Sequence, residues 1–190
     1  MKRSKRIAAA LTSLTTIVAT AFATISAAPA HAADSDTSVP PEITMPGSPD
    51  GIPSAGNGPI KLFTYPASVY ALAHPGTNPQ GANNFSCKPR EGQNPVVLLP
   101  GTNFDAYASW SMYAPKLTKL GYCVFSPNFN GLKLLPSFAY TGDIRVSAKA
   151  VSGFVDRVLT ATKSKRVDLI GWSQGCLLYT SDAADERSSV

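Results

Sequence analysis

The sequence predicts an α/β protein with a doubly wound, mostly parallel sheet. Three short and largely apolar segments, residues 96–99, 122–125 and 167–170, have the composition of strands that a parallel sheet buries on both faces. Two longer segments with helical periodicity separate them, so strand and helix alternate along the chain. This alternation favours parallel strands joined by right-handed helical crossovers.

The first strand and the helix expected after it are delimited by turn residues. Pro100 and Gly101 follow Val96–Leu99 directly and end the strand. The helix is expected to end at Gly121, because glycine readily takes the positive φ found just after a helix. The apolar side chains of this helix fall on one face at helical spacing: Trp110, Tyr113, Leu117 and Leu120.

The second helix is marked by a cap and a regular apolar face. Asp143 stands directly before the first apolar residue, where an N-capping carboxylate is expected. The apolar residues that define the face are Ile144, Ala148, Val151, Val155 and Val158. Residues 128–140 show no clean period and are expected to form a long loop. Residues 59–94 are loop-rich, with a short strand expected at Ile60–Tyr65.

The N-terminus has the three parts of a secretory signal peptide. Basic residues open the chain, an apolar run extends from Ile7 to about Ala28, and Ala30-His31-Ala32 supplies a small-x-small cleavage site. The basic residues are Lys2, Arg3, Lys5 and Arg6. We therefore expect residues 1–32 to be removed and the mature protein to be secreted. An uncleaved anchor is the alternative, because the run is nearly long enough to span a bilayer.

Composition defines the rest of the domain organisation. Residues 33–58 are rich in Ser, Pro, Asp and Gly and bury too little apolar surface to offset their ordering entropy, so a disordered or arm-like segment is expected. Hydrophobic residues make up 44 % of the chain and charged residues 15 %, which predicts a buried core in a domain over residues 59–175. The net charge of +5 comes largely from the signal segment, and no basic stripe with interleaved aromatics follows it. Nucleic acid is therefore not an expected partner.

The three cysteines are interpreted in the light of secretion, which places them in an oxidising compartment. Cys87 and Cys123 each lie beside a predicted strand and can form a disulfide, which would contribute about 3–4 kcal/mol through the loop that it closes. Cys176 is left without a partner.

A Gly-x-Ser-x-Gly pattern, residues 171–175, directly follows the third strand. The pattern alone is common, but an apolar strand before it and a helix start after it are typical of a nucleophile elbow. In such an elbow the glycines allow a turn sharp enough to lift the hydroxyl of Ser173 above the carboxyl edge of the sheet. An ordinary strand-to-helix turn with Ser173 as N-cap is the alternative.

A serine nucleophile also needs hydrogen-bond donors for the oxyanion that it creates. One expected donor is the backbone N–H of Gln174, the residue after the serine. The other is Thr102, which follows Leu99-Pro100-Gly101 in the loop after the first strand. A plain turn role for Thr102 is the alternative.

Several spaced motifs over roughly Asn84 to Gly175 resemble those of the secreted bacterial lipases and esterases of the class 2 lipase type. They read PVVLLPGTNFDAYASW, LTKLGYCVFSPNFNG, TGDIRVSA, FVDRVLTAT and VDLIGWSQG, and the pairing of Leu-Pro-Gly-Thr with Trp-Ser-Gln-Gly is also similar to fungal lipase B. The resemblance implies an α/β-hydrolase fold, present here only through the elbow, with a Ser-Asp-His triad, no metal and lipid or ester substrates. It places Ser173 on the nucleophile and Thr102 and Gln174 on the oxyanion pair. Pro100 departs from the His-Gly that is commoner among the bacterial members.

The rest of the triad is missing from this chain. In this fold an acid and then a histidine follow the serine, whereas no histidine follows Ser173, and His74 lies before it in a His-Pro-Gly turn. The chain as written is therefore expected to be inactive. Residues from Cys176 to Glu186 resemble a translated sequencing adapter, so residues 176–190 are expected to be a non-native tail. A divergent native C-terminus is the alternative.

We expect a secreted carboxylic-ester hydrolase acting through an acyl-enzyme on Ser173, with no cofactor. A cutinase or an acyltransferase of the same fold is an alternative within this mechanism, and a non-catalytic binding fragment is the alternative from another class. Asp168, inside the third strand, is expected to be a surface or pairing residue rather than the triad acid. Core packing, rather than an acyl pocket, is expected for the aromatic residues after the first strand: Phe104, Tyr107, Trp110 and Tyr113.

Overall fold

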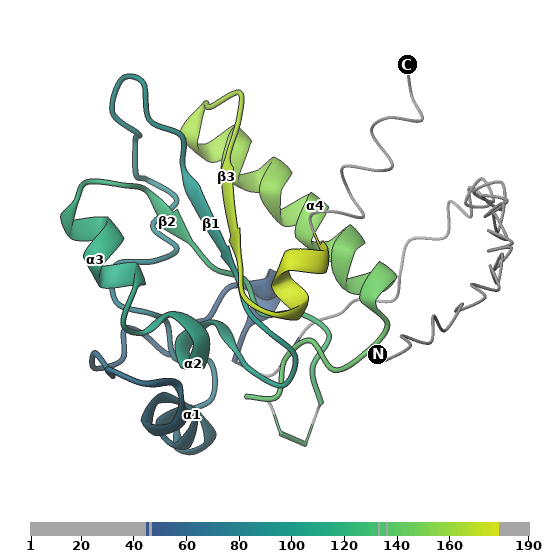
Figure 1. Ribbon diagram of the computed structural model, residues 1–190. Coiled ribbons are helices and arrows are strands. Elements are labelled where there is room, and N and C mark those ends of the chain that lie inside the picture. The colour runs from purple at the N-terminus through teal and green to yellow at the C-terminus, as the bar shows by residue number, and fades with distance from the viewer. Residues whose placement is uncertain (1–44, 46, 133, 136, 179–190) are drawn as a thin grey trace, which may run out of the picture. The chain divides into compact units, whose positions relative to one another are not determined.

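The computed structural model describes residues 45, 47–132, 134–135 and 137–178. The expected signal peptide, residues 1–32, and residues 179–190 of the expected tail lie outside these residues. The elements in chain order are η1 (Pro49–Gly51), α1 (Thr64–Ala73), β1 (Val96–Leu99), α2 (Ala106–Trp110), α3 (Ala114–Lys119), β2 (Val124–Phe125), α4 (Ile144–Thr162) and β3 (Asp168–Gly171) (Figure 1). Residues 174–178 form a further helical turn after β3.

The sheet has the strand order β2-β1-β3, and both pairs of neighbouring strands are parallel (Figure 1). Val96 pairs with Val124 of β2 on one side and with Asp168 of β3 on the other. The chain therefore moves from β1 to one neighbour and then crosses to the opposite side. This order confirms an α/β architecture with a parallel sheet, in the form of a small open sheet.

Both faces of β1 are buried, as its continuous apolar sequence predicts. Val97 and Leu99 belong to a core that includes Val158 of α4, whereas Leu98 belongs to a second core with Trp110. Helices thus cover both faces of the sheet, with α4 on one face and α2 and α3 on the other. Each large apolar side chain buried in this way stabilises the fold by roughly 1.5–3 kcal/mol.

Helix α4 confirms its prediction. The Asp143 carboxylate accepts a hydrogen bond from the Arg145 backbone N–H at 2.8 Å, and the helix ends at Lys163 with a φ of 58°. Val151 and Val158 are buried, and the other predicted apolar residues of this face pack against the same core.

The prediction of a single helix ending at Gly121 is wrong, because the structure has two short helices, α2 and α3, in that part of the chain. Pro115 lies in the first turn of α3, where its missing N–H is tolerated. In a continuous helix the same proline would clash with the carbonyl of residue 111. Leu120 and Tyr113 therefore leave the predicted face and are exposed, whereas Trp110 and Leu117 pack in the core as expected.

The strand expected at Ile60–Tyr65 is also wrong, since helix α1 begins at Thr64. Pro66 lies in its first turn, a position that suits a helix and not a strand. Ala67 and Ala71 of α1 are buried against Tyr107 of α2. The helix escaped the sequence pattern because its outward side chains are apolar too, so no period of polar and apolar residues marks it.

Two further segments are tied to the core. Within the segment expected to be an arm, the Met45 side chain is buried, and Asn128 donates a hydrogen bond from Nδ2 to the Ser48 Oγ at 3.0 Å. Cys87 and Cys123 form the predicted disulfide, with a Cα–Cα distance of 5.7 Å. Among the described residues, no helix is both long and apolar enough to span a membrane.

Candidate active site

Ser173 lies two residues after the end of β3, with Trp172 between them, and directly before a helical turn. Its φ is 53°, in the left-handed region that residues other than glycine rarely occupy. Such a conformation costs on the order of 1–3 kcal/mol, and it persists only where the surroundings impose it. The Ser173 side chain is exposed, so the strained turn presents its hydroxyl to solvent.

The two flanking glycines explain why the chain can turn so sharply. A Cβ atom on Gly171 would lie 2.5 Å from the backbone nitrogen of Cys176, and one on Gly175 would lie 2.3 Å from the carbonyl oxygen of Leu99. Both contacts are with backbone, which cannot move aside cheaply. The spacing Gly-x-Ser-x-Gly is therefore a requirement of this turn.

Hydrogen bonds fix the turn to the central strand. The Trp172 N–H donates to the Leu99 carbonyl at 3.1 Å, which continues the β1–β3 ladder by one residue. The Gly175 N–H then donates to the Trp172 carbonyl at 2.9 Å, and the Cys176 N–H donates to the Ser173 carbonyl at 2.9 Å. The chain thus passes from strand to helix with Ser173 at the apex.

The loop after β1 lies against this apex. A Cβ on Gly101 would be 3.2 Å from the Ser173 Cβ, so the Gly101 backbone and the Ser173 side chain are neighbours. Thr102 is the next residue along this loop, and its side chain is exposed. Within the described part of the chain, no hydrogen bond engages the backbone N–H of Thr102 or Gln174. Both predicted oxyanion donors are therefore unpaired within the described residues.

The positions of Thr102 and Ser173 relative to the strands are also informative. Thr102 follows β1 and Ser173 follows β3, and the strand order reverses between these two strands. In open α/β sheets, ligands bind outside the carboxyl ends of the strands where the order reverses. The fold thus brings the predicted nucleophile and the predicted donor loop to the place where such sheets hold ligands.

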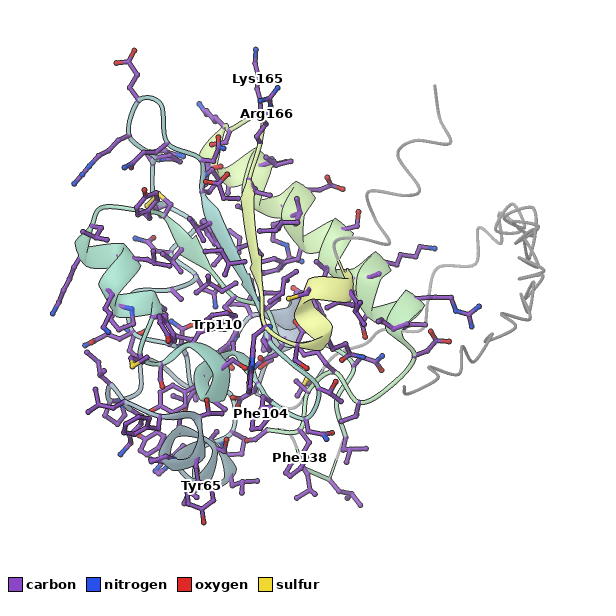
Figure 2. The ribbon with its side chains drawn as sticks, viewed as in Figure 1. Tyr65, Phe104, Trp110, Phe138, Lys165 and Arg166 are labelled. Carbon is purple, nitrogen blue, oxygen red and sulfur yellow. A yellow bond between two sulfur atoms is a disulfide. The ribbon has the colours of Figure 1, made fainter. Side chains whose placement is uncertain are left out.

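Aromatic side chains divide between the site and the core. Phe104 contacts Trp172 with ring centroids 5.0 Å apart, so it lies beside the turn and not in the core (Figure 2). Tyr107 and Trp110 are buried as core residues, as expected, and the Tyr107 hydroxyl donates to the Pro59 carbonyl. Tyr113, expected in the core, is half exposed.

Asp105 is a residue near the site that the sequence interpretation missed. It caps α2, its Oδ1 accepting from the Ala108 N–H at 2.7 Å, and its side chain is fully buried. Its Oδ2 has no hydrogen-bond partner among the described residues. Burial raises the pKa of this carboxyl to about 7, because desolvation outweighs the backbone N–H donors that lower it. An aspartate just before an apolar helix start was the available sequence signal.

The two remaining titratable candidates lie elsewhere. His74 follows the last turn of α1, where its ring stacks on Tyr70 at 4.1 Å and its Nδ1 lies 3.1 Å from the Tyr70 carbonyl. Asp168 begins β3, at the opposite end of the strand from Ser173, and its Oδ1 accepts from the Asn94 Nδ2 at 2.9 Å. Asp168 is thus a pairing residue on the surface. Neither His74 nor Asp168 is bonded to Ser173.

No cluster of three or more histidine, cysteine or acidic side chains within the described residues could hold a metal ion. Comparison with known proteins adds no family: no protein-family model matches the chain, and no curated protein is found to be similar. The chemistry of the site must therefore be argued from its geometry.

Proposed function

We propose that Ser173 is the nucleophile of a secreted enzyme that hydrolyses carboxylic esters through an acyl-enzyme intermediate. One observation carries the proposal: Ser173 adopts a φ of 53° between two glycines that tolerate no Cβ, at the carboxyl end of a parallel strand. A strained and exposed serine in such a turn is the arrangement of a nucleophile elbow. A serine that only capped the following helix would not need this strain.

The neighbouring backbone supports acyl transfer in particular. Attack of the Ser173 oxygen on an ester carbonyl places negative charge on the carbonyl oxygen, which two N–H donors can stabilise. The free N–H groups of Thr102 and Gln174 are the donors that we assign to this role. The alcohol then leaves, and water releases the acid from Ser173. Lipids and other carboxylic esters are the substrate class, and this chemistry needs no cofactor.

The proposal also requires a base, because a neutral serine hydroxyl is a weak nucleophile. His74 is held by Tyr70 in a turn before β1 and is not assigned this role. We propose that the acid and the histidine belong to native sequence that continues after Gly175 in the natural gene. The 190-residue chain is accordingly expected to be inactive.

The test is active-site labelling with a fluorophosphonate, which reacts only with activated serines. We expect the product of the natural gene, read through codon 175, to be labelled, and we expect Ser173→Ala to abolish labelling. Ser86→Ala, at another exposed serine, is the matched control and should label normally. The proposal would be overturned if the folded protein encoded by the natural gene is not labelled, or if it is still labelled after Ser173→Ala. The non-catalytic alternative would then remain.

A further inference from the structure

The segments that lead into the three strands carry an excess of basic side chains. They are residues 88–95, 119–123 and 163–167, and together they contain six basic residues and one acidic residue, Glu91. All six basic residues are exposed. We call them the basic surface: Lys88, Arg90, Lys119, Lys163, Lys165 and Arg166.

The fold brings these three segments together although they are far apart in the sequence. The strands are parallel, so their first residues lie along the same edge of the sheet. At this edge the Val96 N–H donates to the Cys123 carbonyl at 2.8 Å, and the Asp168 N–H donates to the Pro95 carbonyl at 2.9 Å. The disulfide between Cys87 and Cys123 adds a covalent link between the first two segments. The basic surface is therefore built on a cross-linked part of the fold.

Helix ends explain the position of some of these cations. Lys88 Nζ donates to the Ala161 carbonyl at 2.6 Å, and Arg90 Nη1 donates to the Leu120 carbonyl at 3.3 Å, so both satisfy carbonyls at the ends of α4 and α3. Two more cations lie at the ends of the same helices, where the helix dipole favours a positive charge by about 0.3–1 kcal/mol: Lys119 and Lys163. Within the described residues, two side chains have neither role and bond to no other group: Lys165 and Arg166.

Carboxylates do not balance the basic surface. In the part of the chain that the structure describes, the one ion pair joins Asp143 to Arg145 at the start of α4. The carboxylate of Asp168, close to Arg166 in the sequence, accepts a hydrogen bond from the Asn94 Nδ2 at 2.9 Å instead. An unbalanced cluster of one sign of charge produces a field that attracts a partner of the opposite sign.

The other side chains of these segments discriminate among anionic partners. Tyr122 is their single aromatic residue and is half-buried, so no exposed ring is present on which the bases of a nucleic acid would stack. Leu120 is their single exposed large apolar residue, which gives little to insert among lipid acyl chains. Exposed cations without aromatic or apolar anchors fit a partner that is held by charge alone, namely a chain of repeated phosphate or sulfate groups.

We infer that the basic surface binds a linear polyanion of repeated phosphate or sulfate groups and holds the protein on it with Ser173 left open. The basic surface precedes the strands and Ser173 follows them, so the two lie at opposite ends of the sheet. Figure 2 shows Lys165 and Arg166 at one end and Phe104, which contacts Trp172, toward the other. The inference goes beyond the proposed function and does not depend on it, because binding of this kind needs no nucleophile.

The test measures the affinity of the protein encoded by the natural gene for long-chain inorganic polyphosphate and for dextran sulfate over a range of salt concentrations. We expect binding to weaken with salt, by about 0.7 in log K per unit of log salt for each cation engaged. The double variant Lys165→Glu, Arg166→Glu should lose at least about tenfold in affinity and show a shallower salt dependence. The matched control is Lys149→Glu, Arg157→Glu, which makes the same change of charge at exposed residues of α4 outside the basic surface and should bind nearly as the parent does. Unchanged circular dichroism and melting would show that all variants fold.

The two polymers distinguish the source of the anionic groups, and the one that stays bound at the higher salt concentration is the partner class. Failure to bind either polymer would overturn the inference. Equal losses in the two double variants would also overturn it, because binding would then depend on net charge alone. Tripolyphosphate that binds as tightly as the long chain would show that a single small ion fills the surface, and a DNA duplex that binds more tightly than both polymers would replace the partner with nucleic acid.

Fluorophosphonate labelling in the presence of saturating polymer tests the position of the basic surface. We expect Ser173 to be labelled at the same rate with and without the polymer, because the polymer is held at the other end of the sheet. Protection of Ser173 would contradict the assignment to the basic surface. A protein that binds the polymer but is not labelled under either condition would retain this inference and lose the proposed function.

Discussion

At the scale of single residues, Asp105 joins a structural role to an unusual ionisation. Its Oδ1 caps α2, while its Oδ2 is buried without a partner in the described structure. A charged carboxylate is poorly solvated there, and its pKa rises from 3.8 to about 7. The folded protein therefore holds its proton over a pH range in which the unfolded chain releases it.

This difference predicts a fall in stability as the pH rises. The free energy of unfolding is highest below about pH 4, where Asp105 is protonated in both states, and it falls as the pH rises toward 7. The pKa difference between the two states corresponds to a total loss on the order of 4 kcal/mol. Asp105→Asn removes the titration but keeps an oxygen that can accept from the Ala108 N–H. We expect the variant to gain unfolding free energy relative to the parent between pH 5 and pH 8, as measured by urea denaturation.

The control is Asp143→Asn at the start of α4. The Asp143 carboxylate is exposed, and its hydrogen bonds with Arg145 lower its pKa to about 2. The stability that it contributes is lost only as the pH falls through that value, so its variant should differ from the parent by a constant amount between pH 5 and pH 8. A constant difference for Asp105→Asn as well would show that Asp105 is charged in the folded protein.

At the scale of elements, the turn around Ser173 predicts that glycine is required at a specific distance from the serine. Gly175→Ala would place a Cβ 2.3 Å from the Leu99 carbonyl oxygen, so backbone must shift. We expect a loss of about 1–3 kcal/mol in unfolding free energy, as for overpacked cores. We also expect the protein encoded by the natural gene to lose fluorophosphonate labelling when it carries this substitution.

Gly153→Ala in α4 provides the opposite control. Nothing lies within 4 Å of a Cβ placed there, and alanine favours a helix over glycine by about 0.5–1 kcal/mol. This variant should be more stable and fully labelled. Equal behaviour of the two variants would mean that the turn is not as tightly packed as the structure indicates.

The elements also show where sequence patterns suffice and where they fail. β1 was predictable because all of its residues are apolar and all are buried. α4 was predictable because its apolar residues recur at helical spacing and the core covers the face that they form. Helix α1 was missed because an exposed apolar side hides the helical period. The break between α2 and α3 depends on Pro115, which lies in the first turn of α3 because that helix begins at Ala114. The apolar spacing of the segment does not indicate this second helix start.

The candidate site was also predictable only in part. Ser173, Gly171 and Gly175 stand together in the sequence, so their turn could be proposed from the motif. The approach of Gly101 to Ser173 depends on β1 and β3 being neighbours, a tertiary fact that the motif alone does not contain. The burial of Asp105 depends likewise on packing around α2, which a capping pattern cannot reveal.

At the scale of the whole molecule, the exposed edge of β3 predicts self-association of the 190-residue chain. β3 pairs with β1 on one side, and no strand within the described residues pairs with its other side. Its sequence is partly apolar, with Ile170 exposed. A bare edge of this kind offers free N–H and carbonyl groups to the edge of another molecule.

We therefore expect sedimentation of this chain to show oligomers that grow with concentration. Ile170→Lys should reduce them, because a lysine on an edge strand resists burial against a second strand. Leu120→Lys, which removes an exposed apolar residue far from this edge in the β2-β1-β3 order, should not. A monomeric parent chain would mean that the edge is already protected. Equal effects of the two lysines would instead assign the association to apolar surface in general, because only pairing through β3 depends on where the charge is placed.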